Sequence, residues 1–156
     1  RSEAPIPLPS GLNEIVIEKQ AMGRTVELGV AIDGRDFTTY HADGVIVATP
    51  TGSTAYNLSA RGPVVAPTHR ALLLTAVSPH SLFDRSLVLE PSSTVEVTVR
   101  SDRSAAVAVD GEHHLALEPG ATVRITADDR PARFVTIHGD RNFHQILKAK
   151  FGLTDR

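Results

Sequence analysis

Residues 94–100 read Thr-Val-Glu-Val-Thr-Val-Arg, and residues 122–126 read Thr-Val-Arg-Ile-Thr. In both stretches apolar and polar side chains alternate strictly, which is the two-residue period of a β-strand with one buried and one solvated face. Valine and threonine, with 16 and 14 copies, favour the same structure throughout the chain. Further short apolar or β-branched runs lie at residues 15–17, 26–32, 44–49, 71–77, 87–89, 105–109 and 133–138.

Turn dipeptides separate these runs: Asp33-Gly34, Asp43-Gly44, Asp110-Gly111 and Pro119-Gly120. Many short strands at a spacing of roughly 8–12 residues indicate an antiparallel sandwich or barrel rather than βαβ units. Helical patterns are confined to residues 53–60, where Thr51 or Ser53 could cap, and to residues 142–151, where Gly152 provides a stop. We therefore expect a single domain over residues 1–156: a mainly β, antiparallel β-sandwich with a short helix after the turn TPTGSTAY and a C-terminal helix.

The composition excludes several classes of function. The chain has Lys+Arg 16 against Asp+Glu 18, a net charge of −2, which argues against a nucleic-acid partner. Cysteine is absent, so disulfides, thiolate metal sites and cysteine nucleophiles are excluded. No apolar run approaches the ~20 residues of a membrane-spanning helix, and we expect no membrane partner.

The most informative segment covers residues 43–67 and reads DGVIVATPTGSTAYNLSARGPVVAP. A buried strand leads into Thr49–Thr54, a turn rich in glycine and hydroxyl side chains at a predicted helix start. Free N–H groups and hydroxyls at such a place suit a phosphate or a ribose, and the ring of Tyr56 could stack on a base. The alternative is that the hydroxyls only cap the helix. The turn is neither a P-loop nor a nucleophile elbow, because it lacks Gly-Lys-Ser/Thr and the second glycine respectively.

Residues 49–57, Thr-Pro-Thr-Gly-Ser-Thr-Ala-Tyr-Asn, preceded by Asp43-Gly44, resemble the NAD-binding signature of the NAD kinases. Four further stretches resemble segments of the same family in the same order: residues 12–17 (LNEIVI), 76–82 (AVSPHSL), 85–89 (RSLVL) and 107–111 (VAVDG). The resemblance covers nearly the whole chain. It implies the C-terminal, NAD-binding domain of such an enzyme.

NAD kinases phosphorylate the adenosine-ribose 2′-hydroxyl of NAD with ATP or, in some members, polyphosphate. The resemblance implies that Asn13 and Glu14 contact the ribose and adenine side of NAD. Asp43 is implied at the nicotinamide end, often from a neighbouring subunit in this family, and Asp110 stands where the family has a carboxylate near the active cleft. The other residues implied in NAD binding belong to the turn and the helix after it: Thr51, Ser53, Thr54, Ala55, Tyr56 and Ser59.

The family's Gly-Gly-Asp-Gly-Thr motif, whose aspartate is the proposed base, does not occur in this sequence. In the family it belongs to an N-terminal α/β domain, so we expect that domain to be absent here. We expect no catalytic residue and no metal site in this chain, and no turnover by the chain alone. The resemblance implies that ATP or polyphosphate, with Mg²⁺ or another divalent metal, binds through the N-terminal domain. It also implies a cytoplasmic homodimer or homotetramer.

Two alternatives remain on the sequence alone. One is a stand-alone nucleotide-binding or regulatory module, and the other is the C-terminal domain of a related diacylglycerol-type lipid kinase. One departure from the family pattern is Arg61, where the family commonly has glycine. If that position requires a positive φ, Arg61 is strained.

Overall fold

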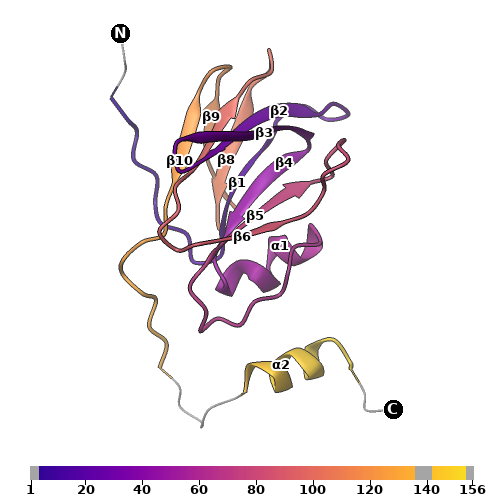
Figure 1. Cartoon of the computed structure of the whole chain (residues 1–156), viewed down its shortest axis with the longest axis vertical. Helices are drawn as coiled ribbons and strands as arrows, with labels where there is room; N and C mark the ends of the chain where they lie inside the picture. The colour runs from indigo at the N-terminus through magenta and orange to yellow at the C-terminus, as the bar shows by residue number, and fades with distance from the viewer. Residues whose placement is uncertain (1–3, 136–141, 154–156) are drawn as a thin grey trace.

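Ten strands form two antiparallel sheets that pack face to face (Figure 1) within residues 4–135 and 142–153, the parts of the chain that the structure, a computed structural model, describes. One sheet has six strands in the order β6-β5-β4-β1-β8-β9, and the other has four in the order β10-β7-β2-β3. The strands are β1 (Glu14–Lys19), β2 (Val26–Ile32), β3 (Arg35–Ala42), β4 (Gly44–Ala48), β5 (Leu72–Val77), β6 (Leu87–Leu89), β7 (Val95–Val99), β8 (Ala105–Val109), β9 (Glu112–Leu117) and β10 (Thr122–Ile125). The predicted antiparallel β-sandwich is thus confirmed.

The main core lies between the two sheets and is built by the alternation seen in the sequence. In β7, Val95, Val97 and Val99 are buried while the residues between them are half-buried. They pack in one cluster with inward side chains of both sheets, among them Leu28 of β2 and Leu74 of β5. A smaller cluster lies on the outer face of the six-stranded sheet and consists of Val16, Ile46, Ala48 and Leu73.

The edge strands β3 and β9 have no counterpart among the predicted runs. Most residues of β3 are exposed, from Arg35 to Thr38, and β9 carries exposed polar residues such as His113 and His114. Exposed residues occupy most positions of both strands, so neither shows an apolar run, whereas the edge strands β6 and β10 do show an apolar run or strict alternation. The opposite error concerns the run 133–138. Residues 133–135 form no strand, Phe134 and Val135 are exposed, and the rest lies outside the described residues.

Both predicted helices are present in the described residues. The first is split into a 3-10 turn, η1 (Thr51–Thr54), and a single α-helical turn, α1 (Tyr56–Ser59). Neither Thr51 nor Ser53 provides a side-chain cap; the Thr49 hydroxyl instead accepts a hydrogen bond from the N–H of Gly52 at 3.1 Å. The second helix, α2 (Phe143–Lys150), begins after Asn142, whose side chain accepts from the N–H of His144, and it is followed by Gly152 at a φ of 61°.

The strand order places three chain segments together at one end of the six-stranded sheet. β1 lies between β4 and β8 and runs antiparallel to both. The start of β1 therefore meets the ends of β4 and β8. Residues 13–14, 49–51 and 110 become neighbours there, although they are far apart in the sequence.

Candidate functional site

The candidate site is centred on Asn13 and Glu14, at the entrance to β1. Asn13 belongs to the preceding loop, and Glu14 is the first residue of the strand. The loop is fastened to the end of β4, because the N–H of Thr49 donates to the carbonyl of Asn13 at 2.8 Å and the Thr49 hydroxyl donates to the carbonyl of Leu12 at 2.7 Å. The side chain of Asn13 has no hydrogen bond to another described residue.

Asp110 holds the same loop from the other side. Its carboxylate accepts hydrogen bonds from three successive backbone N–H groups, those of Leu12 at 2.6 Å, Asn13 at 2.7 Å and Glu14 at 3.0 Å. Asp110 has a φ of 48° and precedes Gly111 at 83°, which are the positive values that a two-residue hairpin turn between β8 and β9 requires. The turn thus aims the carboxylate at the loop, and the loop conformation depends on it.

Glu14 is a buried carboxylate with an unsatisfied oxygen. The residue is 7% exposed, and its Oε2 atom has no hydrogen-bond partner. Burial is the main cause that raises the pKa of Glu14 above its ordinary 4.5; the charge of Asp110 raises it further, and a hydrogen bond from the backbone N–H of Tyr56 acts in the opposite direction. Because the folded chain then holds its proton at a pH where the unfolded chain has released it, the stability decreases as the pH rises above 4.5 through the folded pKa. A ligand that donates a hydrogen bond to Oε2 would offset the free-energy cost of burying the ionised carboxylate.

The turn at residues 49–56 lies over the outer face of the six-stranded sheet and is tightly fitted. Gly52 has no room for a Cβ, because such an atom would collide with the backbone of Asn13. Ser53 is fully buried, and its hydroxyl both donates to the carbonyl of Val65 and accepts from the N–H of Val65, each at 3.0 Å. The hydroxyl of this predicted NAD-binding residue is therefore engaged in holding the loop after α1.

Tyr56 interacts with charged groups near both ends of β1. Its backbone N–H points to Glu14, whereas its side chain is influenced by the charges near the other end of the strand. Burial, followed by the charges of Glu18 and Asp43, raises the pKa of the Tyr56 hydroxyl above its ordinary value. The residue is 37% exposed, so part of its ring is open to a ligand.

Asp43 is not part of the cluster around Glu14. It lies between β3 and β4 beside the end of β1, where its carboxylate forms a 2.5 Å ion pair with Lys19. Glu14 and Lys19 are five residue steps apart along the strand, or roughly 17 Å at the usual rise per residue. One small molecule could reach both ends only in an extended conformation.

The remaining predicted residues differ in accessibility. Thr54 and Ser59 are exposed, whereas Thr51 and Ala55 are half-buried. A groove of about 1640 Å³ borders the site; Glu14, Thr49 and Thr51 belong to its wall, and residues 5–12 and 121–132 form much of the rest. Of the predicted residues only Glu14 and Thr51 belong to this wall; Asp110 and Tyr56 do not.

The sequence analysis missed the role of Thr49, which the structure makes the link between the turn and the Asn13 loop. Its position directly after the strand and three residues before Gly52 was the available signal. Across the described residues, no group of three or more His, Cys, Asp or Glu side chains is arranged to hold a metal ion. None of the helices in this part of the chain has the length and apolar character needed to cross a bilayer.

Comparison with protein families gives a match to the ATP-NAD kinase C-terminal domain over residues 12–137. NAD kinase 1 of Streptomyces coelicolor is 44% identical over 148 residues, which are 94% of this chain and 40% of that protein. The NAD kinase of Lachnoclostridium phytofermentans is 36% identical over 148 residues, 92% of this chain and 52% of that protein. The chain therefore spans about half, or less, of the length of these curated relatives.

Two solved structures resemble the sandwich. The yeast NADH kinase in complex with NADH is 37% identical, with a TM-score of 0.71 over 74% of this chain and 34% of that one. An NAD kinase from Archaeoglobus fulgidus in complex with ATP is 29% identical, with a TM-score of 0.69 over 78% of this chain and 47% of that one. Both structures therefore resemble this chain in sequence as well as in fold.

Proposed function

Because the chain belongs to the ATP-NAD kinase C-terminal domain family, we propose that it forms the NAD-binding part of an NAD kinase. In this proposal the whole protein transfers a phosphoryl group to the 2′-hydroxyl of the adenosine ribose of NAD. The relatives with NADH and with ATP bound support nucleotides as its substrates. This chain holds and orients the dinucleotide, and the groups that act on the donor lie outside its 156 residues.

The observation that carries the proposal is the buried, unsatisfied Oε2 atom of Glu14, the residue that follows Asn13 at the entrance to β1. An ionised carboxylate only accepts hydrogen bonds, and a ribose diol presents two hydroxyl donors close together. Asn13 adds a carbonyl acceptor and an amide donor for the same sugar or its base. A ribose here would supply the donor that Oε2 lacks, which would offset the desolvation of Glu14.

The turn and the far end of β1 would hold the rest of the molecule. The partly exposed ring of Tyr56 lies beside the base, with Thr51, Thr54, Ala55 and Ser59 along the bound dinucleotide. Ser53 and Asp110 support these contacts by fixing the backbone of the turn and of the Asn13 loop. Asp43, at the opposite end of β1 from Glu14, would contact the nicotinamide end of the dinucleotide. In an oligomer, that dinucleotide would be the one bound to a neighbouring subunit.

The remaining components belong to the whole protein. The phosphoryl donor is ATP or polyphosphate, and a divalent metal such as Mg²⁺ accompanies it. The assembly would be a homodimer or homotetramer in the cytoplasm. No step of the transfer is assigned to a residue of this chain.

A titration with NAD tests the site. In Glu14→Gln one acceptor oxygen and the charge are lost, so we expect NAD affinity measured by calorimetry to fall at least about tenfold. The same change removes a buried charge, so the stability at pH 7 should be equal to or above that of the wild type. Glu112→Gln, on the exposed edge strand β9, is the matched control and should bind like the wild type.

The titration should be run on the chain alone and with a family N-terminal domain added in trans. If the wild-type chain binds NAD in neither condition, or Glu14→Gln binds as well as the wild type, the assignment of the site is wrong. Tight binding by the chain alone, unaffected by the added domain, would favour a stand-alone binding module. With NAD, ATP and Mg²⁺ we expect no NADP from the chain alone; clear NADP formation would contradict that expectation.

A further inference from the structure

A chain of buried polar side chains lies beneath the 49–56 turn and outside the set discussed above. Asn57, in α1, and Thr75, in β5, are 0% and 3% exposed. The Thr75 hydroxyl lies 2.7 Å from Oδ1 of Asn57 and 2.8 Å from the hydroxyl of Ser86, which precedes β6. The Asn57 amide nitrogen donates to the carbonyls of Ser53 at 3.4 Å and Pro63 at 3.1 Å.

These contacts hold the turn together and join it to two other parts of the molecule. The bond to Ser53 holds η1, the bond to Pro63 holds the loop after α1, and Thr75 ties both to β5 of the six-stranded sheet. Both N–H bonds of the Asn57 amide and one lone pair of its oxygen are used, which leaves little freedom for the side chain.

Gly62 shows how closely the surroundings fit Asn57. Its N–H donates to the Asn57 carbonyl at 2.8 Å, and a Cβ at position 62 would collide with the Asn57 carboxamide. In addition, the Ser53 hydroxyl is bonded to both backbone groups of Val65. Hydrogen bonds between Ser53 and Val65 therefore hold the two ends of this segment together, with the Asn57 amide buried within it.

We propose that Asn57 and Thr75 are positioning residues of the dinucleotide site: they fix the turn at residues 49–56 over the sheet without touching the ligand. This inference rests on the proposed function for its ligand, but not for the positioning itself. The backbone N–H of Tyr56, which immediately precedes Asn57, bonds to Glu14. A shift of the turn would therefore move Tyr56 and change the surroundings of the Glu14 carboxylate together.

Thr75→Val tests the proposal because it keeps the side-chain shape and removes the hydroxyl. It leaves Oδ1 of Asn57 and the Ser86 hydroxyl without this partner. We expect hydrogen exchange of the Ser53, Ala55 and Val65 amides, measured by NMR on the whole chain, to accelerate about tenfold. NAD affinity should weaken by about the same factor, at a temperature where the variant is fully folded.

Two further variants complete the test. Thr75→Ser retains the hydroxyl and should restore exchange and affinity to within about twofold of the wild type. Thr98→Val is the control on the four-stranded sheet, where the hydroxyls of Thr98 and Thr122 pair with each other. It should change neither quantity. Equal acceleration in β4 and β5, or an unchanged affinity with a loosened turn, would overturn the positioning role. Absence of NAD binding by the wild type would overturn the proposed function alone, and the exchange data would still decide whether the network positions the turn.

Discussion

Arg61 has a backbone conformation that residues with a side chain rarely adopt. Its φ is 63°, in the left-handed region, and it lies between α1 and the buried Gly62. The comparison of this position with the family's glycine had suggested such a strain. Among the described residues, three other non-glycine residues share a positive φ, and two of them, Asp33 and Asp110, are hairpin-turn residues followed by glycine. For an aspartate this conformation is common, whereas for arginine it is costly.

Arg61→Gly should therefore stabilise the chain. The left-handed conformation costs a residue with a Cβ about 1–2 kcal/mol, and glycine loses part of that gain through the entropy of the unfolded chain. We expect a net increase of about 0.5–1 kcal/mol in the free energy of unfolding, measured with urea. Arg61→Ala keeps the Cβ and should give no such gain; equal stabilisation by both variants would show that the arginine side chain, not its φ, is unfavourable.

The carboxylate of Asp110 links the turn between β8 and β9 to the loop that contains Asn13. Asp33 lies in a similar turn without such a link, so a comparison of the two residues measures what the link contributes. Asp110→Asn replaces an acceptor of three N–H bonds with a carboxamide that has one acceptor oxygen and one misplaced donor. We expect a loss of about 1–3 kcal/mol of stability by urea unfolding, together with weaker NAD binding. Asp33→Asn alters the same kind of turn, but the carboxylate of Asp33 accepts a backbone bond only from Thr94 and should cost less. Equal losses would mean that the turn, not the loop, is what Asp110 stabilises.

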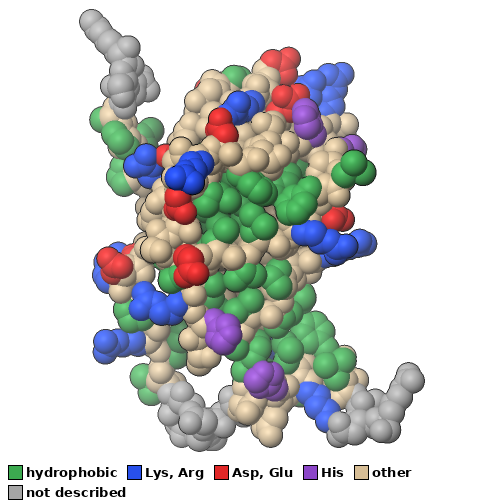
Figure 2. All heavy atoms as spheres, in the orientation of Figure 1, with side chains coloured by type: hydrophobic (Ala, Val, Ile, Leu, Met, Phe, Trp, Pro, Cys, Tyr) green, Lys and Arg blue, Asp and Glu red, His purple; other side chains and the backbone are tan. Residues whose placement is uncertain are grey.

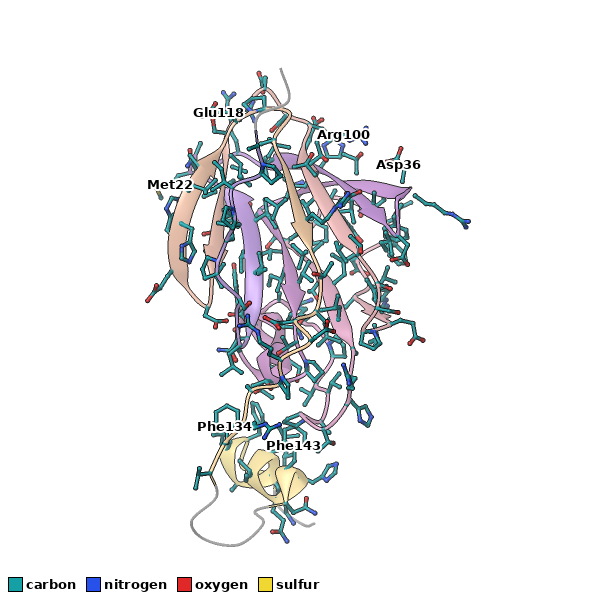
Figure 3. The ribbon with its side chains drawn as sticks, turned by 90° about the vertical axis from the view of Figure 1, so that its left-hand side faces the viewer. Met22, Asp36, Arg100, Glu118, Phe134 and Phe143 are labelled. Carbon is teal, nitrogen blue, oxygen red and sulfur yellow. The ribbon has the colours of Figure 1, made fainter. Side chains whose placement is uncertain are left out.

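Among the elements, α2 differs from the rest of the molecule. It lies beyond the end of the sandwich, with Phe134 and Phe143 labelled in the same region (Figure 3), and none of its residues is buried. Ile146 is 39% exposed, and hydrophobic side chains are visible on the surface in this area (Figure 2). The stability of the helix therefore comes mainly from its own backbone and its cap.

Asn142→Ala should unfold α2 without affecting the sandwich. The variant loses the acceptor for the His144 N–H, which costs a helix about 1 kcal/mol. We expect faster hydrogen exchange in residues 143–150, while the free energy of unfolding of the sheets changes by less than about 0.5 kcal/mol. Asn142→Asp retains an acceptor oxygen and should behave like the wild type. A clear loss of global stability in Asn142→Ala would show that α2 supports the sheets after all.

For the molecule as a whole, the six-stranded sheet separates two apolar clusters. Leu73 and Leu74 are neighbours in β5, but Leu74 faces the core between the sheets and Leu73 faces the cluster on the side of the turn. Both are leucines and both are essentially unexposed, so neither size nor burial distinguishes them. Only one of the two clusters supports the candidate site.

Leu73→Ala and Leu74→Ala should differ in their effect on binding. Each leaves a cavity, and we expect each to cost about 2–5 kcal/mol of stability in urea. Under conditions where both remain folded, Leu73→Ala should also accelerate hydrogen exchange in the turn and weaken NAD binding, whereas Leu74→Ala should do neither. Equal effects on the turn would mean that the two faces of the sheet are not independent.

The sequence alone determined the secondary structure of most strands, the class of fold and the family. Alternation such as that of residues 94–100 records which side of a strand is buried, and turn dipeptides record where strands end; both are local properties. The signature at residues 49–57 is equally local. The strands β3 and β9 escaped because exposed residues occupy most of their positions, and the cap at Thr49 escaped because its partner is fixed by the turn geometry.

The tertiary structure decided which of these local features meet. The order β4-β1-β8 brings Asp110 to backbone groups 96 to 98 residues away, and it leaves Glu14 buried with an unsatisfied oxygen. It also places Asp43 at the other end of β1 and closes Asn57 and Thr75 beneath the turn. No local pattern states these contacts, because strand partners are chosen by the burial of both sheet faces at once, a property of the whole sandwich.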